Sequence, residues 1–392
     1  MSERGATFKD VFAVKEFRVL FGSFALLVGG DSVKMLALSV LVYDRTGSPG
    51  LSAAAYMAGW LPYIFGGLFL LSLADRLPPR GLMIAGEVVR LVVCLLMAFA
   101  GLPVWAMLAL VLVSGLFSPV FGAARNALLP DLLPGDAFVL ARSLLGVTSA
   151  SAQIGGMALG GGILALTGPA GALALTAGLS AVAAVVLRFG LPYRAARNAG
   201  GRGTIRTTLR VNRGLAADRR VRGLLLAMWV PVMFLAGAEA VLVPYLGAAA
   251  GVALAAAACG MAVGEFVVGR FVAPGTRERL SLPLAAMIGV PWLGFALQPG
   301  VVVAAALAAL SAGCMAYQLG LQRRFVTAVP EDVRGQAFGL QSAGLMTGQA
   351  VGAALVGGLA EVTGTHQAIA VSGGLAILAA LALARPLRPE LP

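Results

Sequence analysis

The chain has 392 residues, of which 59% are hydrophobic and only 12% are charged, and its formal net charge is +12. Soluble domains are about 45–50% apolar and about 25% charged, so this composition excludes a water-soluble globule. We therefore expect an integral membrane protein.

The beginning of the chain, MSERGATFKDVFAVKEFRVL, is polar and charged and is not typical of a cleaved signal peptide. The apolar run after it is therefore predicted to remain as a membrane span. Cys94, Cys259 and Cys314 all lie inside apolar runs, which favours a packing role. The sequence has a single histidine, His366, and no zinc-protease, nucleophile-elbow or phosphate-loop motif. We expect no enzyme, no bound metal and no cofactor.

Membrane-spanning helices are predicted from the apolar runs, because about 20 apolar residues are needed to cross the hydrocarbon core. The twelve runs lie at 19–43, 50–74, 81–100, 103–124, 138–166, 169–190, 222–247, 251–273, 280–298, 301–322, 336–360 and 366–384. The predicted fold class is an all-α integral membrane protein with twelve transmembrane helices. An even number places both termini on one side.

Lysine and arginine are concentrated on one side of this predicted topology, and an excess of these residues marks cytoplasmic loops. Segment 188–222 alone holds ten arginines, whereas the loops on the opposite side carry essentially Arg45. The other basic residues on the first side are Arg4, Lys9, Lys15, Arg18, Arg76, Arg80, Arg125, Arg142, Arg270, Arg277, Arg279, Arg323, Arg324, Arg334, Arg385 and Arg388. We expect both termini to be cytoplasmic, the plasma membrane as the location, and no nucleic-acid partner.

An internal repeat divides the sequence into halves. QIGGMALGGGILALTG at 153–168 recurs as QAVGAALVGGLAEVTG at 349–364, and the offset is 196 residues. The repeat predicts an N-terminal six-helix bundle at 1–190, a basic cytoplasmic linker at 191–221 and a C-terminal six-helix bundle at 222–392. Repeats of this kind, related by an axis along the membrane normal, are typical of transporters.

Three segments carry a resemblance to a known family: FRVLFGSFALLVGGDSVKMLALSVLVYDRTGSPG, LADRLPPRGLMIAGEVVR and VPEDVRGQAFGL. Together they resemble the major facilitator superfamily, particularly its drug:proton antiporter, macrolide-efflux-like branch. Leu71 and Pro78 replace two glycines of the family's loop signature. Gly156 stands where the antiporter motif of the fifth helix usually has proline.

The resemblance implies a cytoplasmic gate. Asp75 is expected against the N-terminus of the helix near 336–340, and Arg76 is expected to pair with Asp131 or Asp136. The predicted gate residues are Asp75, Arg76, Arg80, Asp131 and Arg334.

Charged residues inside the predicted spans are the candidates for function, because each costs about 2.5–3.5 kcal/mol to insert into the bilayer core. Asp31 and Lys34 are three residues apart and can neutralise one another, so Asp31 fits either proton coupling or a structural pair. Glu87 and Arg90 repeat this spacing and are predicted to be a structural intramembrane pair.

Two further carboxylates and three glutamines complete the candidate list. Glu239 has no local partner and fits a proton or substrate site, or a position near the helix end. Glu265 fits such a site or an ion pair with Arg270. The polar candidates are Gln153, Gln318 and Gln349, which fit hydrogen bonds to a substrate or between helices.

The resemblance implies a secondary active transporter that exports a small amphipathic or hydrophobic compound, such as a drug, antibiotic or secondary metabolite. It implies alternating access and proton antiport, with the proton gradient as energy source and antibiotic resistance as an expected consequence. A siderophore-like metabolite is the alternative cargo. A non-transporting membrane sensor or scaffold with the same fold is the alternative of another class. The expected partners are a small-molecule substrate and the bilayer, and we expect a monomer.

Overall fold

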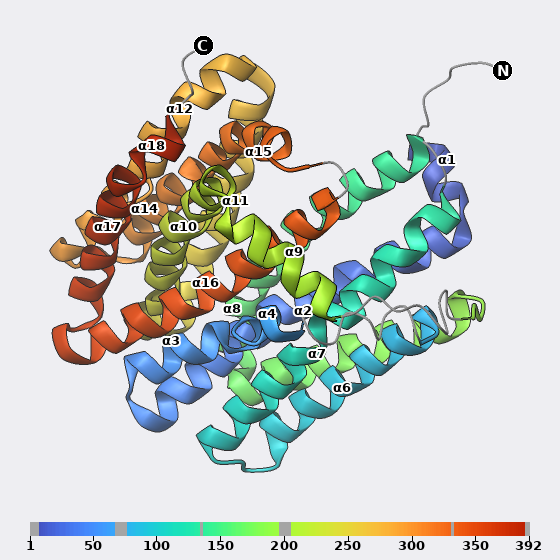
Figure 1. Cartoon of the computed structure of the whole chain (residues 1–392). Coiled ribbons are helices and arrows are strands. Elements are labelled where there is room, and N and C mark those ends of the chain that lie inside the picture. The colour runs from blue at the N-terminus through green and yellow to red at the C-terminus, as the bar shows by residue number, and fades with distance from the viewer. Residues whose placement is uncertain (1–7, 67–76, 134–135, 196–204, 331–332, 389–392) are drawn as a thin grey trace. The chain divides into compact units, whose positions relative to one another are not determined.

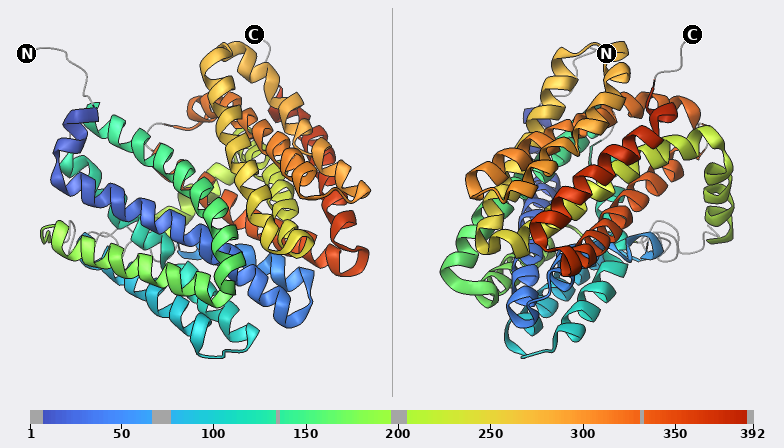
Figure 2. Two further views of the ribbon diagram at one scale, coloured as in Figure 1. Left: turned by 180° about the vertical axis from the view of Figure 1, so that it is seen from behind. Right: turned by 90° about the vertical axis from the view of Figure 1, so that its left-hand side faces the viewer.

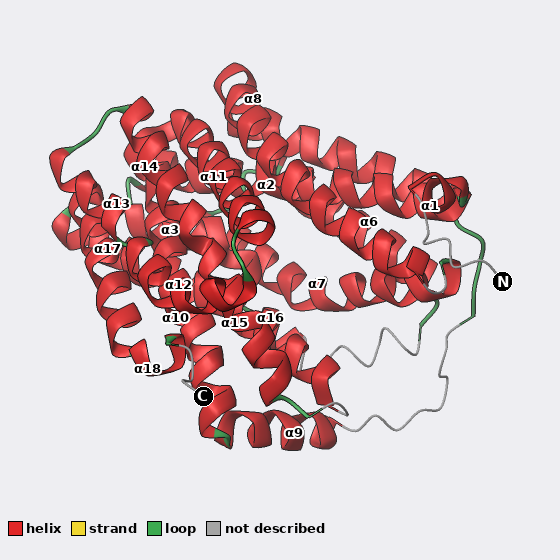
Figure 3. Ribbon diagram, turned by 90° about the horizontal axis from the view of Figure 1, so that it is seen from above, coloured by secondary structure: helices red, strands yellow, loops and turns green. Residues whose placement is uncertain are grey.

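The computed structural model describes residues 8–66, 77–133, 136–195, 205–330 and 333–388. Every regular element within these ranges is a helix, as Figure 3 shows. Ten helices of the described residues are long and apolar enough to cross a membrane. The prediction of an all-α membrane protein is confirmed.

The number of spans differs from the predicted twelve for two reasons. The predicted spans 138–166 and 169–190 form one element, α8 (Asp136–Gly190), which is broken at Gly168 by a non-helical backbone with φ 69° and ψ 178°. The predicted span 50–74 lies partly outside the described residues. Its described part consists of α3 (Pro49–Met57), η1 (Ala58–Trp60) and α4 (Tyr63–Phe65). The count of twelve therefore stays a prediction.

The chain forms two compact units. The first contains Met1–Ala37 and Phe65–Gly203, and the second contains Leu38–Ile64 and Thr204–Pro392. Segment 38–64 therefore packs with residues of the second half of the chain, although it belongs to the first half in sequence. The bundle and linker boundaries predicted above follow the sequence order and stay predictions.

The first unit is built from α1 (Phe8–Ala13), most of α2 (Lys15–Thr46), α6 (Pro79–Phe99), α7 (Val104–Leu132) and α8. Helix α6 packs along both α7 and α8 (Figure 1). Buried aliphatic and aromatic side chains fill one end of this unit, among them Phe17, Leu20, Val120, Leu128 and Leu187.

The second unit holds α3 and the remaining helices. Helix α10 packs against α16 and α17, and α11 packs against α14; Figures 1 and 2 show these helices from three sides. Their bounds are α9 (Ile205–Ala217), α10 (Arg219–Leu246), η3 (Gly247–Ala249), α11 (Ala250–Phe271), α12 (Pro274–Met287), α13 (Val290–Leu293), η4 (Gly294–Leu297), α14 (Val301–Gly313), η5 (Cys314–Ala316), α15 (Tyr317–Ala328), α16 (Arg334–Thr363), α17 (Thr365–Ala382) and α18 (Ala384–Leu387).

The repeated Thr-Gly pair forms the same turn in both units. Gly364 has φ 89° and ψ 157° and separates α16 from α17, just as Gly168 breaks α8. Thr167 Oγ1 donates to the carbonyl of Ile163 at 2.8 Å, and Thr363 Oγ1 donates to that of Leu359 at 3.0 Å. Positive φ is costly for residues with a Cβ, which explains the glycine at both positions. The structure thus supports the internal repeat inferred from the sequence.

Two other repeated glycines allow helices to touch. A Cβ on Gly156 of α8 would lie 2.7 Å from the Gly29 carbonyl oxygen of α2. A Cβ on Gly352 of α16 would overlap the Met233 carbonyl oxygen of α10. Close backbone approach at small residues is the usual way in which membrane helices pack, since lipid offers little hydrophobic driving force between helices.

Candidate functional site

Four charged side chains of the first unit form one continuous network. Lys34 Nζ lies 2.6 Å from Asp31 Oδ1, and Arg90 Nη1 lies 2.9 Å from Glu87 Oε2. Arg90 Nε also lies 3.2 Å from Asp31 Oδ1 and so joins the two pairs. The pairing within each helix is confirmed, whereas the link between α2 and α6 depends on helix packing that sequence spacing does not reveal.

Arg125 of α7 is a fifth member that the sequence analysis placed in a cytoplasmic loop. That placement was wrong, because α7 continues to Leu132 and Arg125 is only 5% exposed. Its Nη2 lies 4.0 Å from Glu87 Oε1, and its guanidinium carbon lies 5.1 Å from the centre of the Phe24 ring. The buried row Val120, Ala124 and Leu128, at helical spacing, is the sequence signal that extends the helix past Arg125.

The network is closed at one end and open at the other. The Glu87 and Arg125 side chains are 2% and 6% exposed, whereas 34% of the Asp31 side chain is exposed. Ser180 of α8 lies within hydrogen-bonding reach of Glu87. Glu87 and Arg90 therefore connect α6 to its neighbours, and Asp31 is the member of the network that water or a solute reaches most easily.

Glu239 is the most distinctive candidate of the second unit. It lies in the C-terminal third of α10, which ends at Leu246, between buried Ala238 and Ala240, and its own side chain is half-buried. Among the described residues it forms no ion pair and accepts no side-chain hydrogen bond. The buried Tyr56 of α3 is close enough for its hydroxyl to interact electrostatically with this carboxylate. An ionisable side chain within a membrane helix and without a counter-charge marks a functional position.

The other intramembrane candidates are less constrained. Glu265 is exposed on α11 beside Val263 and Phe266, and within the described part of the chain it forms no ion pair with Arg270. Gln318 donates to the Met228 carbonyl at 3.5 Å, the limit of a hydrogen bond. Gln153 on α8 and Gln349 on α16 are both half-buried. Their roles stay predictions.

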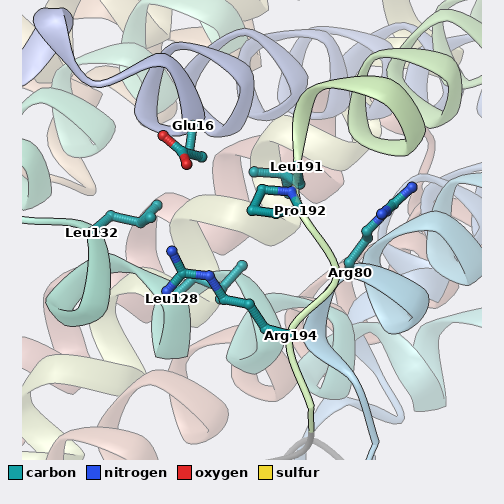
Figure 4. A pocket seen from close by; sticks show the side chains of 7 residues that line it. All are labelled: Glu16, Arg80, Leu128, Leu132, Leu191, Pro192 and Arg194. Atoms are coloured by element: carbon teal, nitrogen blue, oxygen red, sulfur yellow. The ribbon is translucent and has the colours of Figure 1, made fainter.

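The predicted gate is only partly visible. Asp75 and Arg76 lie outside the described residues, and Arg334 begins α16 without a described side chain. Arg80 donates to the Arg188 carbonyl at the end of α8, and Asp131 lies 4.0 Å from Arg194. Arg80 also borders a small recess whose lining Figure 4 shows: Glu16, Arg80, Leu128, Leu132, Leu191, Pro192 and Arg194.

The family model of the Major Facilitator Superfamily matches residues 20–325. The chain belongs to the major facilitator superfamily. No curated protein sequence matches it. The drug:proton antiporter branch therefore remains an expectation from resemblance.

Solved structures of major facilitators share the fold at low sequence identity. A point mutant of the nucleoside transporter NupG is 15% identical with a TM-score of 0.73, covering 95% of this chain and 99% of that one. A bacterial homologue of the human lysosomal transporter Spinster is 12% identical with a TM-score of 0.73, over 99% and 100% of the two chains. A POT family transporter in complex with 5-aminolevulinic acid is 13% identical with a TM-score of 0.69, over 94% and 95%.

Proposed function

We propose that this major facilitator exports a small amphipathic or hydrophobic compound in exchange for protons, by alternating access. The fold supports membrane transport of a small molecule and a protein that is not an enzyme. The direction, the class of cargo and the proton coupling rest on the family resemblance described above and on the two intramembrane carboxylates, Asp31 and Glu239.

The observation that carries the proposal is the position of Glu239. A group that takes up and releases a proton in each cycle must not be held permanently by a cation, because a nearby positive charge favours the ionised form. Asp31 is contacted by both Lys34 and Arg90, whereas Glu239 has no ion pair among the described residues. Tyr56 beside it supplies a hydroxyl and an aromatic ring. Glu239 is therefore assigned as the proton carrier.

The test measures cargo-dependent proton movement in everted membrane vesicles, with a panel of neutral, cationic and anionic amphipathic compounds. In the wild type, at least one compound is expected to dissipate the proton gradient. Cells that express the protein should accumulate less of this compound than control cells, unless a protonophore is present. Glu239→Gln should abolish the proton signal. Glu265→Gln is the matched control, because this carboxylate also has no ion pair among the described residues but is exposed on α11, whereas Glu239 is half-buried beside Tyr56. The control should leave the signal intact.

Two results contradict the proposal. Absence of proton movement with every compound, together with reduced accumulation that a protonophore does not affect, refutes antiport. An unchanged signal in Glu239→Gln with a lost signal in Asp31→Asn moves the proton carrier to the first unit.

A further inference from the structure

The charge network of the first unit is not neutral. Among the described residues it contains three cations, Lys34, Arg90 and Arg125, but only two carboxylates, Asp31 and Glu87. All five belong to helices α2, α6 and α7, which are long and apolar enough to span the membrane. Arg125 and Glu87 are almost completely buried, and a buried net positive charge is unfavourable unless an anion compensates it.

Arg125 holds the uncompensated charge. Its nearest carboxylate among the described residues, that of Glu87, is 4.0 Å away and lies closer to Arg90, at 2.9 Å. Its Nε is buried and has no hydrogen-bond partner among the described residues. The Phe24 ring stabilises the guanidinium, but a ring face does not neutralise a charge. Because Arg125 also attracts Glu87, less of that carboxylate's charge compensates Arg90.

The excess positive charge acts on the partly exposed side chains of the network. The Lys34 and Arg90 side chains are 18% and 15% exposed, so a solute can approach both. Arg90 uses Nε for Asp31 and Nη1 for Glu87, which leaves Nη2 without an ion pair in the described structure. Lys34 Nζ and Arg90 Nε both contact Asp31 Oδ1, at 2.6 and 3.2 Å, so the ammonium and the guanidinium lie around one carboxylate oxygen. The remaining N–H groups of both side chains can donate to a second carboxylate, and such charge-assisted hydrogen bonds are strong.

We propose that Lys34 and Arg90 bind a singly charged anionic group, a carboxylate, of the transported compound, and that Arg125 provides the net positive charge that makes this site selective for anions. The proposal rests on the proposed export function only in identifying the anion as part of the cargo, and it narrows that cargo to an amphipathic anion. A cationic compound is disfavoured at this site by the same net charge.

The experiment measures equilibrium binding of radiolabelled benzoate to the purified full-length protein in nanodiscs of uncharged lipid. Benzamide has nearly the same shape and no charge, and it serves as the matched competitor. The decisive variant is Cys94→Asp. Cys94 is buried and lies within electrostatic range of Lys34, Asp31 and Arg90, so an aspartate there supplies the missing carboxylate. Cys94→Asn has the same shape without the charge.

Benzoate should displace the label from the wild type and from Cys94→Asn, whereas benzamide should not. Cys94→Asp and Arg125→Gln should bind benzoate about tenfold more weakly or worse, and Arg125→Lys should restore most of the affinity. Since no proton gradient is present, failure of this binding is distinguishable from failure of proton coupling.

Three outcomes overturn the inference. Equal benzoate affinity in Cys94→Asp and Cys94→Asn shows that the net charge is irrelevant. Competition by benzamide as strong as that by benzoate shows that the aromatic ring and not the carboxylate is recognised. Competition by chloride at the same concentration as benzoate shows a site for small inorganic anions instead of the cargo's carboxylate.

Discussion

Removing Arg90 tests whether the charge network is a single cooperative unit. Arg90→Met takes away the contact of 3.2 Å to Asp31 and that of 2.9 Å to Glu87, and it leaves Glu87 with Arg125 at 4.0 Å. Breaking a buried ion pair by deleting one partner costs about 3–5 kcal/mol, because the remaining charge stays desolvated. Since 15% of the Arg90 side chain is exposed, we expect a loss near the lower limit, about 3 kcal/mol.

The assay is reversible unfolding in mixed micelles of a mild detergent and sodium dodecyl sulfate, applied to a double-mutant cycle. Glu87→Gln and Arg90→Met are measured singly and together. The double variant should be about 2 kcal/mol more stable than the sum of the single losses predicts. Its neutral glutamine at position 87 leaves no buried carboxylate that has lost its ion pair with Arg90. Arg194→Met is the control, since this arginine is more than one third exposed and its contact to Asp131 is 4.0 Å. Exposed pairs contribute about 0–1 kcal/mol. A loss below about 1 kcal/mol in Arg90→Met, or additive losses in the cycle, would refute the cooperative network.

Three further predictions concern packing, the docking of segment 38–64 and topology. Gly156→Ala and Gly352→Ala should lower the unfolding free energy, because each new Cβ meets a carbonyl oxygen of a neighbouring helix. Gly162→Ala and Gly358→Ala have no atom within 4 Å of the new Cβ and should raise the unfolding free energy by up to about 1 kcal/mol in the same assay. Equal effects in the two pairs contradict the packing argument. Glu361→Ala should speed hydrogen exchange at the start of α3, since this carboxylate accepts from Ser48 Oγ and, at 2.9 Å, from the Gly50 amide, and unchanged exchange at Gly50 and Leu51 would show that the contact contributes nothing. A cysteine at the exposed position Leu209, in a variant without the native cysteines, should not react with an impermeant maleimide added to intact cells. Rapid labelling of this cysteine would reverse the predicted cytoplasmic orientation of the basic linker at 191–221.

Much of the fold follows from local sequence signals. Predicted spans such as 81–100, 222–247 and 251–273 coincide within a few residues with α6, α10 and α11, because the length of an apolar run directly reflects the thickness of a bilayer. The Thr-Gly pairs were also predictable, since a residue with positive φ selects glycine and the pattern occurs twice. Helix ends were harder to predict. Helix α7 continues past the apolar stretch, so the sequence did not indicate that Arg125 lies within this helix.

The candidate site was less predictable, because its important contacts join helices that are distant in sequence. Spacing of three residues indicated the pairs Asp31 with Lys34 and Glu87 with Arg90, but no periodicity indicated that Arg90 bridges them. Likewise, Tyr56 was not linked to Glu239, because the sequence does not reveal that segment 38–64 packs with the second half of the chain.

The intramembrane carboxylates of the two units differ in whether cations contact them, and this difference has a functional consequence. In the charge network of the first unit, the described cations outnumber the described carboxylates, so Asp31 and Glu87 each contact a cation and the excess positive charge attracts an anion. In the second unit, Glu239 lacks a cation among the described residues, so its charge changes at a lower electrostatic cost. A transporter that moves an organic anion outward and a proton inward needs both properties, one permanent positive site and one carboxylate that alternates between charged and neutral forms. Glu239→Gln should therefore abolish coupling while leaving benzoate affinity unchanged, and Cys94→Asp should weaken benzoate binding about tenfold or more without altering the carboxylate that carries the proton. If each variant instead removed both activities, anion and proton would share one site, and the division of labour between the two units would be wrong.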